Sequence, residues 1–178
     1  MRKIIVKIHL YLAAFFTPMV LVMALSGGLY LFGIKGATHY EEVATIQGVT
    51  LNHKSPSLKQ EVDKVLQQAG IDVNYEYVKV KGKRLFTRPT SGEHYRLDIR
   101  GSQVLVSRGS PNLQAMLMEL HKGHGPGLFK WLEKAFAVAL VLIMVSGVVL
   151  GLQSPLYKMK TLGLSAAGCV VFLVLAFL

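Results

Sequence analysis

Three long apolar stretches alternate with polar sequence along the 178-residue chain. They run from Leu10 to Ile34, from Ala135 to Leu152 and from Leu162 to Leu178, and none contains a charged residue. At about 1.5 Å per residue they would span roughly 37, 27 and 26 Å as α-helices, against a hydrocarbon core of about 30 Å. The pattern therefore predicts three transmembrane helices.

The polar sequence between the first two stretches has the patterns of a small folded domain. Apolar residues at helical spacing predict a helix at 55–69, which Ser57 can cap, and a second helix at 111–120. Alternating apolar and polar residues predict four strands, at 75–80, 85–88, 95–99 and 104–107. The apolar faces expected for the two helices are Leu58, Val62, Val65 and Leu66 in the first, and Leu113, Met116, Leu117 and Leu120 in the second.

These elements predict the fold class, an α-helical membrane protein of three transmembrane helices with a small extracytoplasmic α+β domain. Residues 1–36 are expected to form the first transmembrane helix, and residues 37–120 the α+β domain. A glycine-rich turn and the second transmembrane helix follow at 121–152, a cytoplasmic loop at 153–160 and the third helix at 161–178.

The distribution of charge predicts the orientation of these helices. The net charge of +10 is typical of nucleic-acid binding, but many of the basic residues flank the helices, which argues against a nucleic-acid partner. Because cytoplasmic loops are enriched in Lys and Arg, we expect the N-terminus in the cytoplasm and residues 37–128 in the periplasm of a bacterial cell. The flanking basic residues, with no acid among them, are Arg2, Lys3, Lys7, Lys158 and Lys160.

The first apolar stretch also has features of a secretory signal. It follows a basic front, and Ala24, Leu25 and Ser26 resemble a cleavage site. The apolar sequence continues as far as Ile34, however, which makes it longer than a typical signal core and favours a membrane helix.

Two histidines lie at opposite ends of the first two predicted membrane helices. His9 stands at the start of the first apolar stretch and His121 shortly before the second, so the path of the chain puts one on each side of the bilayer. An ionisable residue at this position suggests function, and neutral imidazole is a common axial ligand of haem iron. His124 lies in the same glycine-rich turn as His121 and is an equal alternative.

A pair of small residues occurs in each of these two helices, Ser26 with Gly27 and Ser146 with Gly147. Since the helices are antiparallel, Gly27 lies in the same half of the membrane as His121, and Gly147 in the same half as His9. Each half thus offers an imidazole for iron and a position without a side chain for a flat macrocycle. Tight helix packing is the alternative explanation of these glycines.

Haem ligation by two histidines requires a second copy of the chain. About 30 Å of hydrocarbon separates His9 from His121, so they cannot bind one iron within one chain. A two-fold axis along the membrane normal would bring each histidine to its counterpart, which predicts a homodimer with haem at its interface. One histidine per haem with an open site is the alternative.

The remaining histidines give weaker signals. His39, His53 and His94 lie among polar neighbours and are interpreted as solvated surface residues. His39, Glu41 and Glu42 follow the first membrane helix and would offer ligands to a ferric ion. The two carboxylates are hard oxygen donors, which ferric iron prefers. An interfacial polar collar is the alternative.

Together these features resemble the PepSY-associated transmembrane family. Residues 120–151 resemble its pattern of leucine-histidine, glycine-rich turn and apolar helix with a small hydroxyl residue and glycine. His9 ahead of a helix ending in Ser26 and Gly27 is similar to the family's first helix, and residues 55–107 are similar to its PepSY-type domain. The larger members have four or more helices, which again suggests dimerisation here.

The resemblance implies an inner-membrane, iron-regulated protein of the haem-containing ferric or ferric-siderophore reductase kind. It implies haem b bound through His9 and His121, with electrons from a quinol or a cytoplasmic reductase reducing free or chelated Fe³⁺ in the periplasm for iron uptake. PepSY-type domains are also associated with restraining peptidases. The alternative function is therefore a non-catalytic membrane partner or regulator of a peptidase or transporter.

Overall fold

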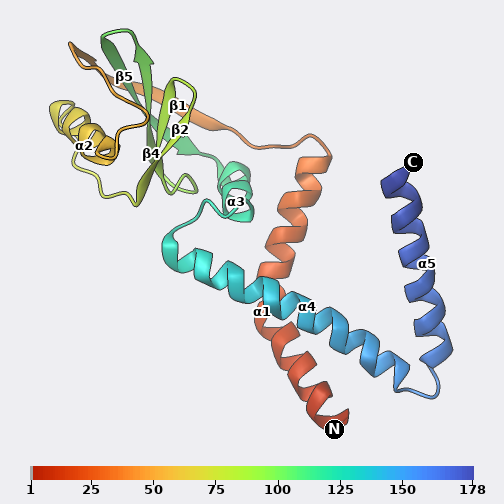
Figure 1. The fold of residues 1–178 in the computed structure, drawn as a ribbon. Helices are drawn as coiled ribbons and strands as arrows, with labels where there is room; N and C mark the ends of the chain where they lie inside the picture. Colours follow the sequence, from red (N-terminus) through yellow and green to blue (C-terminus); the bar gives the residue numbers. More distant parts are fainter. Residues whose placement is uncertain (1) are drawn as a thin grey trace. The chain divides into compact units, whose positions relative to one another are not determined.

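The computed structural model describes residues 2–178, which form five helices and one five-stranded sheet (Figure 1). Three of the helices, α1 (Arg2–Leu31), α4 (Gly127–Leu152) and α5 (Lys158–Phe177), are long and apolar enough to cross a membrane. Large apolar side chains are exposed along all three, as expected for helices surrounded by lipid. The predicted fold class is confirmed, since these helices accompany a small α+β domain in a multi-pass membrane protein.

The chain divides into two compact units. One contains residues 21–133, and therefore the whole sheet with the C-terminal part of α1. The other contains the residues up to Val20 together with residues 134–178. The beginning of α1 and most of α4 belong to this second unit, where the rings of Phe16 and Phe136 pack with their centroids 5.6 Å apart.

The sheet is antiparallel throughout, with the strand order β1-β5-β4-β3-β2. Four of its strands match the predicted alternating segments and extend some of them by one to four residues, because backbone pairing continues beyond the apolar positions. The five strands are β1 (Thr38–Gln47), β2 (Tyr77–Lys81), β3 (Arg84–Arg88), β4 (His94–Arg100) and β5 (Gln103–Pro111).

The strand β1 was not predicted. It pairs along the whole of β5, from Thr38 opposite Pro111 to Gln47 opposite Gln103. The first residues of this strand were expected to form either a ferric site or an interfacial polar collar. None of its residues is fully buried, and a bulge between Glu42 and Ala44 interrupts the alternation of its side chains. An edge strand of this kind depends on the backbone of its neighbour, so its own sequence carries little signal.

The core of the domain lies between the sheet and α2 (Leu58–Gln68). The predicted apolar face of this helix is confirmed, because all four of its residues are buried against strand residues such as Leu85, Leu97 and Val104. Ser57 does occupy the N-cap position, but its hydroxyl donates to Glu61 and accepts no bond from the helix backbone. The packing of α2 thus stabilises this helix more than its cap does.

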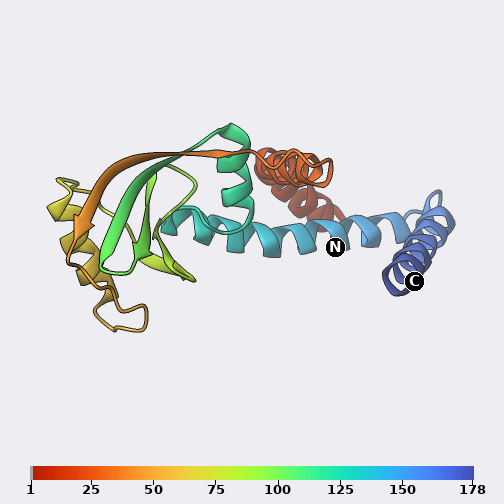
Figure 2. The same cartoon turned by 90° about the horizontal axis from the view of Figure 1, so that it is seen from above.

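Helix α3 (Leu113–His121) packs through a different face from the one predicted. Ala115 and Met118 are buried, whereas Leu113 is 67% exposed. The reason lies in the segment after α1, where Gly36 adopts a φ of +73° and approaches the backbone of Ala115 so closely that a Cβ would collide with it. Only glycine at position 36 permits this approach. Figures 1 and 2 show α3 and α2 on different sides of the sheet.

The predicted glycine-rich turn joins α3 to α4. Helix α3 ends at His121, and Gly123 then adopts a φ of +72°, which reverses the chain with little strain only in glycine. The first turn of α4 is attached to the sheet domain because the Gly127 N–H and the Lys130 ammonium both donate to the Glu76 carboxylate. The bond from Lys130 is the largest cause that lowers the pKa of Glu76.

Candidate functional sites

His121 contacts both residues of the small pair at the end of α1. Its Nδ1 lies 3.1 Å from the hydroxyl oxygen of Ser26, a residue with no exposed surface. A Cβ added to Gly27 would lie 3.2 Å from Cε1 of the same imidazole, closer than ordinary contact. The ring therefore occupies the space that a side chain at position 27 would need.

His9 has the same arrangement with the small pair in α4, within the other unit of the chain. Its Nδ1 lies 2.9 Å from the hydroxyl oxygen of Ser146, and a Cβ at Gly147 would lie 3.3 Å from its Cε1. The two sites thus use the same three residue types, histidine, serine and glycine, in the same contacts.

The serine hydroxyls determine which nitrogen of each imidazole carries the proton. Ser26 donates to the carbonyl of Met23, and Ser146 to the carbonyl of Ile143. A hydroxyl has one proton to donate, so each serine accepts from Nδ1–H of its histidine. A neutral ring in this tautomer has its lone pair on Nε2, and within residues 2–178 neither Nε2 has a hydrogen-bond partner. This is the state in which histidine binds a metal.

The structure brings together the residues that the sequence paired in each half of the membrane, His121 with Gly27 and His9 with Gly147. It gives the glycines a different role, because the imidazole itself fills the space expected for a macrocycle. From the sequence, the serines are predicted only as small residues of the helix interface. The Ser-Gly dipeptide repeated in both helices is the sequence signal for them. That each serine hydroxyl accepts a hydrogen bond from a histidine is visible only in the tertiary contacts.

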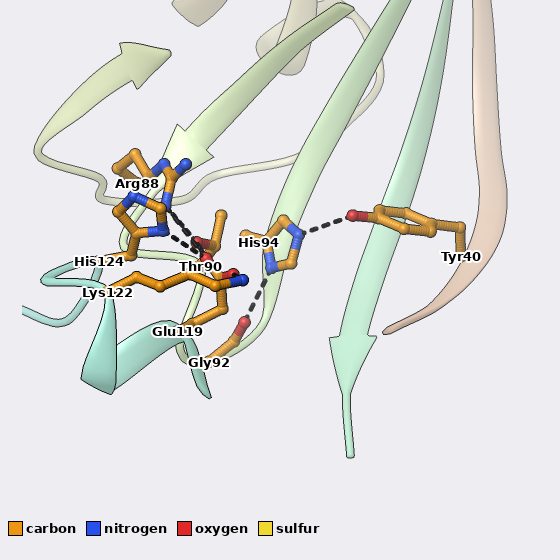
Figure 3. A network of polar contacts seen from close by, with 8 residues as sticks. All are labelled: Tyr40, Arg88, Thr90, Gly92, His94, Glu119, Lys122 and His124. Atoms are coloured by element: carbon orange, nitrogen blue, oxygen red, sulfur yellow. Dashed lines mark hydrogen bonds and ion pairs between the residues drawn. The ribbon is translucent and has the colours of Figure 1, made fainter. Parts of the chain in front are cut away.

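His124 differs from His121, although the sequence made the two equal. Its Nδ1 lies 2.7 Å from Glu119, the centre of a polar network (Figure 3). Glu119 also accepts bonds from Arg88, Thr90 and Lys122. Only His121 therefore reproduces the contacts of His9.

The network keeps Glu119 ionised. Burial raises the pKa of this carboxyl group, but the hydrogen bonds from Thr90 and His124, with the nearby positive charges, outweigh it and lower the pKa to about 2. Arg88, which forms an ion pair with Glu119, is 9% exposed. The negative charge of this carboxylate compensates the positive charge of the buried guanidinium. Their ion pair joins β3 to α3.

His94 is not the surface residue that the sequence predicted, since it is only 3% exposed. Its Nδ1 donates to the carbonyl of Gly92, so its Nε2 accepts from the Tyr40 hydroxyl at 3.2 Å. Gly109 lies opposite both residues in the sheet register, and a Cβ there would lie within 3 Å of each ring. The missing side chain on the middle strand lets the two rings meet, and burial lowers the pKa of His94 and raises that of Tyr40.

The residues considered for a ferric site lie on the edge strand β1. His39, Glu41 and Glu42 are exposed there. Within residues 2–178 no group of three or more His, Cys, Asp or Glu side chains lies close enough together to hold a metal ion. The structure therefore adds no support for a ferric ion bound at these residues.

The fold is that of a multi-pass membrane protein with an attached α+β domain. The model of the family described as the PepSY-associated TM region matches residues 6–160, and the chain belongs to this family. A search of curated proteins and a search of solved structures found no match.

Proposed function

We propose that the chain is a haem b-containing ferric reductase of the bacterial inner membrane, which moves electrons outward to reduce Fe³⁺ to Fe²⁺ for iron uptake. The observation that carries this proposal is the repeated histidine site. In both His9 and His121 a serine fixes the proton on Nδ1 and leaves Nε2 able to bind iron.

The donor set fits haem. His9 and His121 would hold it through Nε2, and the serines would fix the orientation and tautomer of each ring, as the hydrogen-bond partners of metal-binding histidines do. Bound haem supplies one-electron redox chemistry. The glycines allow each imidazole to lie against the neighbouring helix, which limits the rotation of its ring.

The spacing of the two sites along the sequence suits transfer across a bilayer. Ser26 follows His9 by 17 residues in the sequence of α1, which corresponds to about 25 Å of α-helix. The basic residues Lys158 and Lys160 at the end of the loop between α4 and α5, with those at the N-terminus, favour a cytoplasmic His9 and a periplasmic domain at 37–128. The electron donor is then a quinol or a cytoplasmic reductase.

A homodimer would complete the sites. Each site provides one imidazole, and a two-fold axis along the membrane normal would supply the same residue from a second copy. Large apolar side chains are exposed along α1 and α4, so these helices can contact either lipid or another copy. In this proposal the dimer interface contains both pairs of histidines.

The proposal is tested by absorbance. The full chain, purified in detergent from haem-replete cells, is expected to show a b-type reduced-minus-oxidised spectrum with haem in stoichiometric amounts. Adding a ferric chelate to the reduced protein should restore the oxidised spectrum and produce Fe²⁺, which a ferrous-specific dye detects. A colourless chain would contradict the proposal and favour a non-catalytic partner of a peptidase or transporter.

Substitution of Gly27 provides a milder test of the same site. We expect Gly27→Ala to displace the His121 ring by a few tenths of an ångström, because the new Cβ would lie 3.2 Å from Cε1. The haem spectrum or midpoint potential should shift, while most of the haem is retained.

Gly28→Ala is the matched control for this substitution. It makes the same chemical change one residue further along α1, where a Cβ meets nothing within 4 Å. Equal effects of the two substitutions on the spectrum would show that helix propensity, and not contact with His121, causes the change.

A further inference from the structure

A cleft of about 530 Å³ opens on the face of the sheet opposite α2. Phe86 lies on this face, because it alternates along β3 with Leu85, which is buried in the core beneath α2. Arg88, at the end of β3, and Lys122, just after α3, also line the cleft. Small-molecule sites typically have volumes of about 300–1,000 Å³, so the cleft can hold a ligand of modest size.

The lining of this cleft carries an excess of positive charge. Glu119 is its one carboxylate, and this group already accepts hydrogen bonds from four side chains. Four cationic side chains also line the cleft. The lining therefore has a net charge of three positive units when its histidines are neutral. The cationic residues are Lys79, Lys81, Arg88 and Lys122.

Several of these cations have donors available for a ligand. Lys79 and Lys81 are exposed on the edge strand β2, and within residues 2–178 neither forms an ion pair. Arg88 uses only Nη1 in its bonds to Thr90 and Glu119, and a guanidinium has five N–H donors. Two lysines that line a concave site without a counter-ion attract an anion.

The rest of the lining is neutral and partly aromatic. The rings of Tyr40 and Phe86 contribute to it, and the Tyr40 hydroxyl is already bonded to the neutral ring of His94. The site thus combines positive donors with flat apolar surface. The positive donors match a compact ligand with several carboxylates, and the apolar surface can contact its short carbon skeleton.

We propose that this cleft binds a small ferric chelate whose ligands are carboxylates, of the citrate type. The choice of iron as the metal rests on the reductase function proposed above. Arginine and lysine are matched to carboxylate oxygens by charge, and arginine also by its planar fork. A neutral or cationic hydroxamate chelate would gain nothing from the unpaired lysines, so the cleft selects chelates by charge.

Binding is measured by calorimetry on the full chain in detergent, with gallium(III) citrate as the probe. Gallium replaces ferric iron but is not reduced, so the titration reports binding without electron transfer. We expect saturable binding that weakens as ionic strength rises, because the attraction is between charges. Titration with a cationic gallium hydroxamate chelate is expected to show no binding.

The double variant Lys79→Gln and Lys81→Gln is expected to weaken binding of gallium citrate by at least about tenfold, since the loss of even one charge-assisted contact costs about a factor of ten. Both side chains are exposed, so the fold should be retained. The control is Lys83→Gln, which removes the same charge from the turn between β2 and β3, outside the cleft lining. Replacing both lysines with arginine should restore binding.

Equal affinity for the hydroxamate chelate or for inorganic phosphate would overturn the proposal, as would an unchanged affinity in the double variant. Its failure is distinguishable from failure of the reductase function. A colourless chain that binds gallium citrate would contradict the redox proposal alone. A haem-loaded chain that does not bind it would contradict the cleft assignment alone.

Discussion

Replacing His121 or His9 with alanine is expected to abolish haem binding at the affected site. Each variant removes the only imidazole that its site provides, and neither Ser26 nor Ser146 can replace Nε2 as a ligand of haem iron. If each site holds its own haem, the haem content per chain should fall by about half in each single variant and to background in the double variant. Pyridine haemochrome absorbance of the purified chains measures this content.

Two further histidine variants serve as controls. His39→Ala changes an exposed residue of β1 and should leave the haem content unchanged. His124→Ala removes a partner of Glu119 and should also retain haem, although His124 lies only three residues from His121. Loss of haem in His124→Ala with retention in His121→Ala would reverse the assignment made from the Ser26 contact.

The substitution Glu119→Ala is expected to destabilise the α+β domain by about 3 kcal/mol, because it leaves the buried Arg88 guanidinium without its carboxylate. In a domain of this size, a loss of about 3 kcal/mol should lower the Tm by roughly 15 °C. The measurement is thermal denaturation of the full chain in detergent, followed by circular dichroism. Hydrogen exchange should increase in α3 and in the segment after β3.

Glu93→Ala is the control for this loss of an ion pair. Glu93 pairs with Arg108, but both side chains are about half exposed, and such pairs contribute at most about 1 kcal/mol. Similar stability losses in the Glu93 and Glu119 variants would contradict the special role of the Glu119 network.

The same carboxylate makes stability depend on pH. The folded-state pKa of Glu119 is about 2, below its ordinary value of 4.5, so its contribution is complete above pH 4.5 and is lost as the pH falls towards 2. Glu119→Gln should remove this part of the acid sensitivity. The comparison is the Tm of both proteins measured across this interval of pH. Parallel curves would show that other groups cause the acid loss.

Local sequence patterns were sufficient for the elements that depend on their own residues. The three apolar helices, the buried face of α2 and four of the five strands follow from composition and periodicity, because lipid or one packed face determines them. The edge strand β1 and the buried face of α3 did not follow. In both cases the deciding partner, β5 or the backbone near Gly36, lies far away in the sequence.

The sequence by itself determined a membrane protein of three spans with a histidine at each side of the first helix pair, because hydrophobic length and the order of residues require it. Only the tertiary structure decided how those histidines are used. It places a serine hydroxyl on Nδ1 of each ring, separates His121 from His124, and buries His94 against Tyr40 over Gly109. These contacts join residues from different elements, and hydrogen-bond geometry is fixed only when the chain has folded.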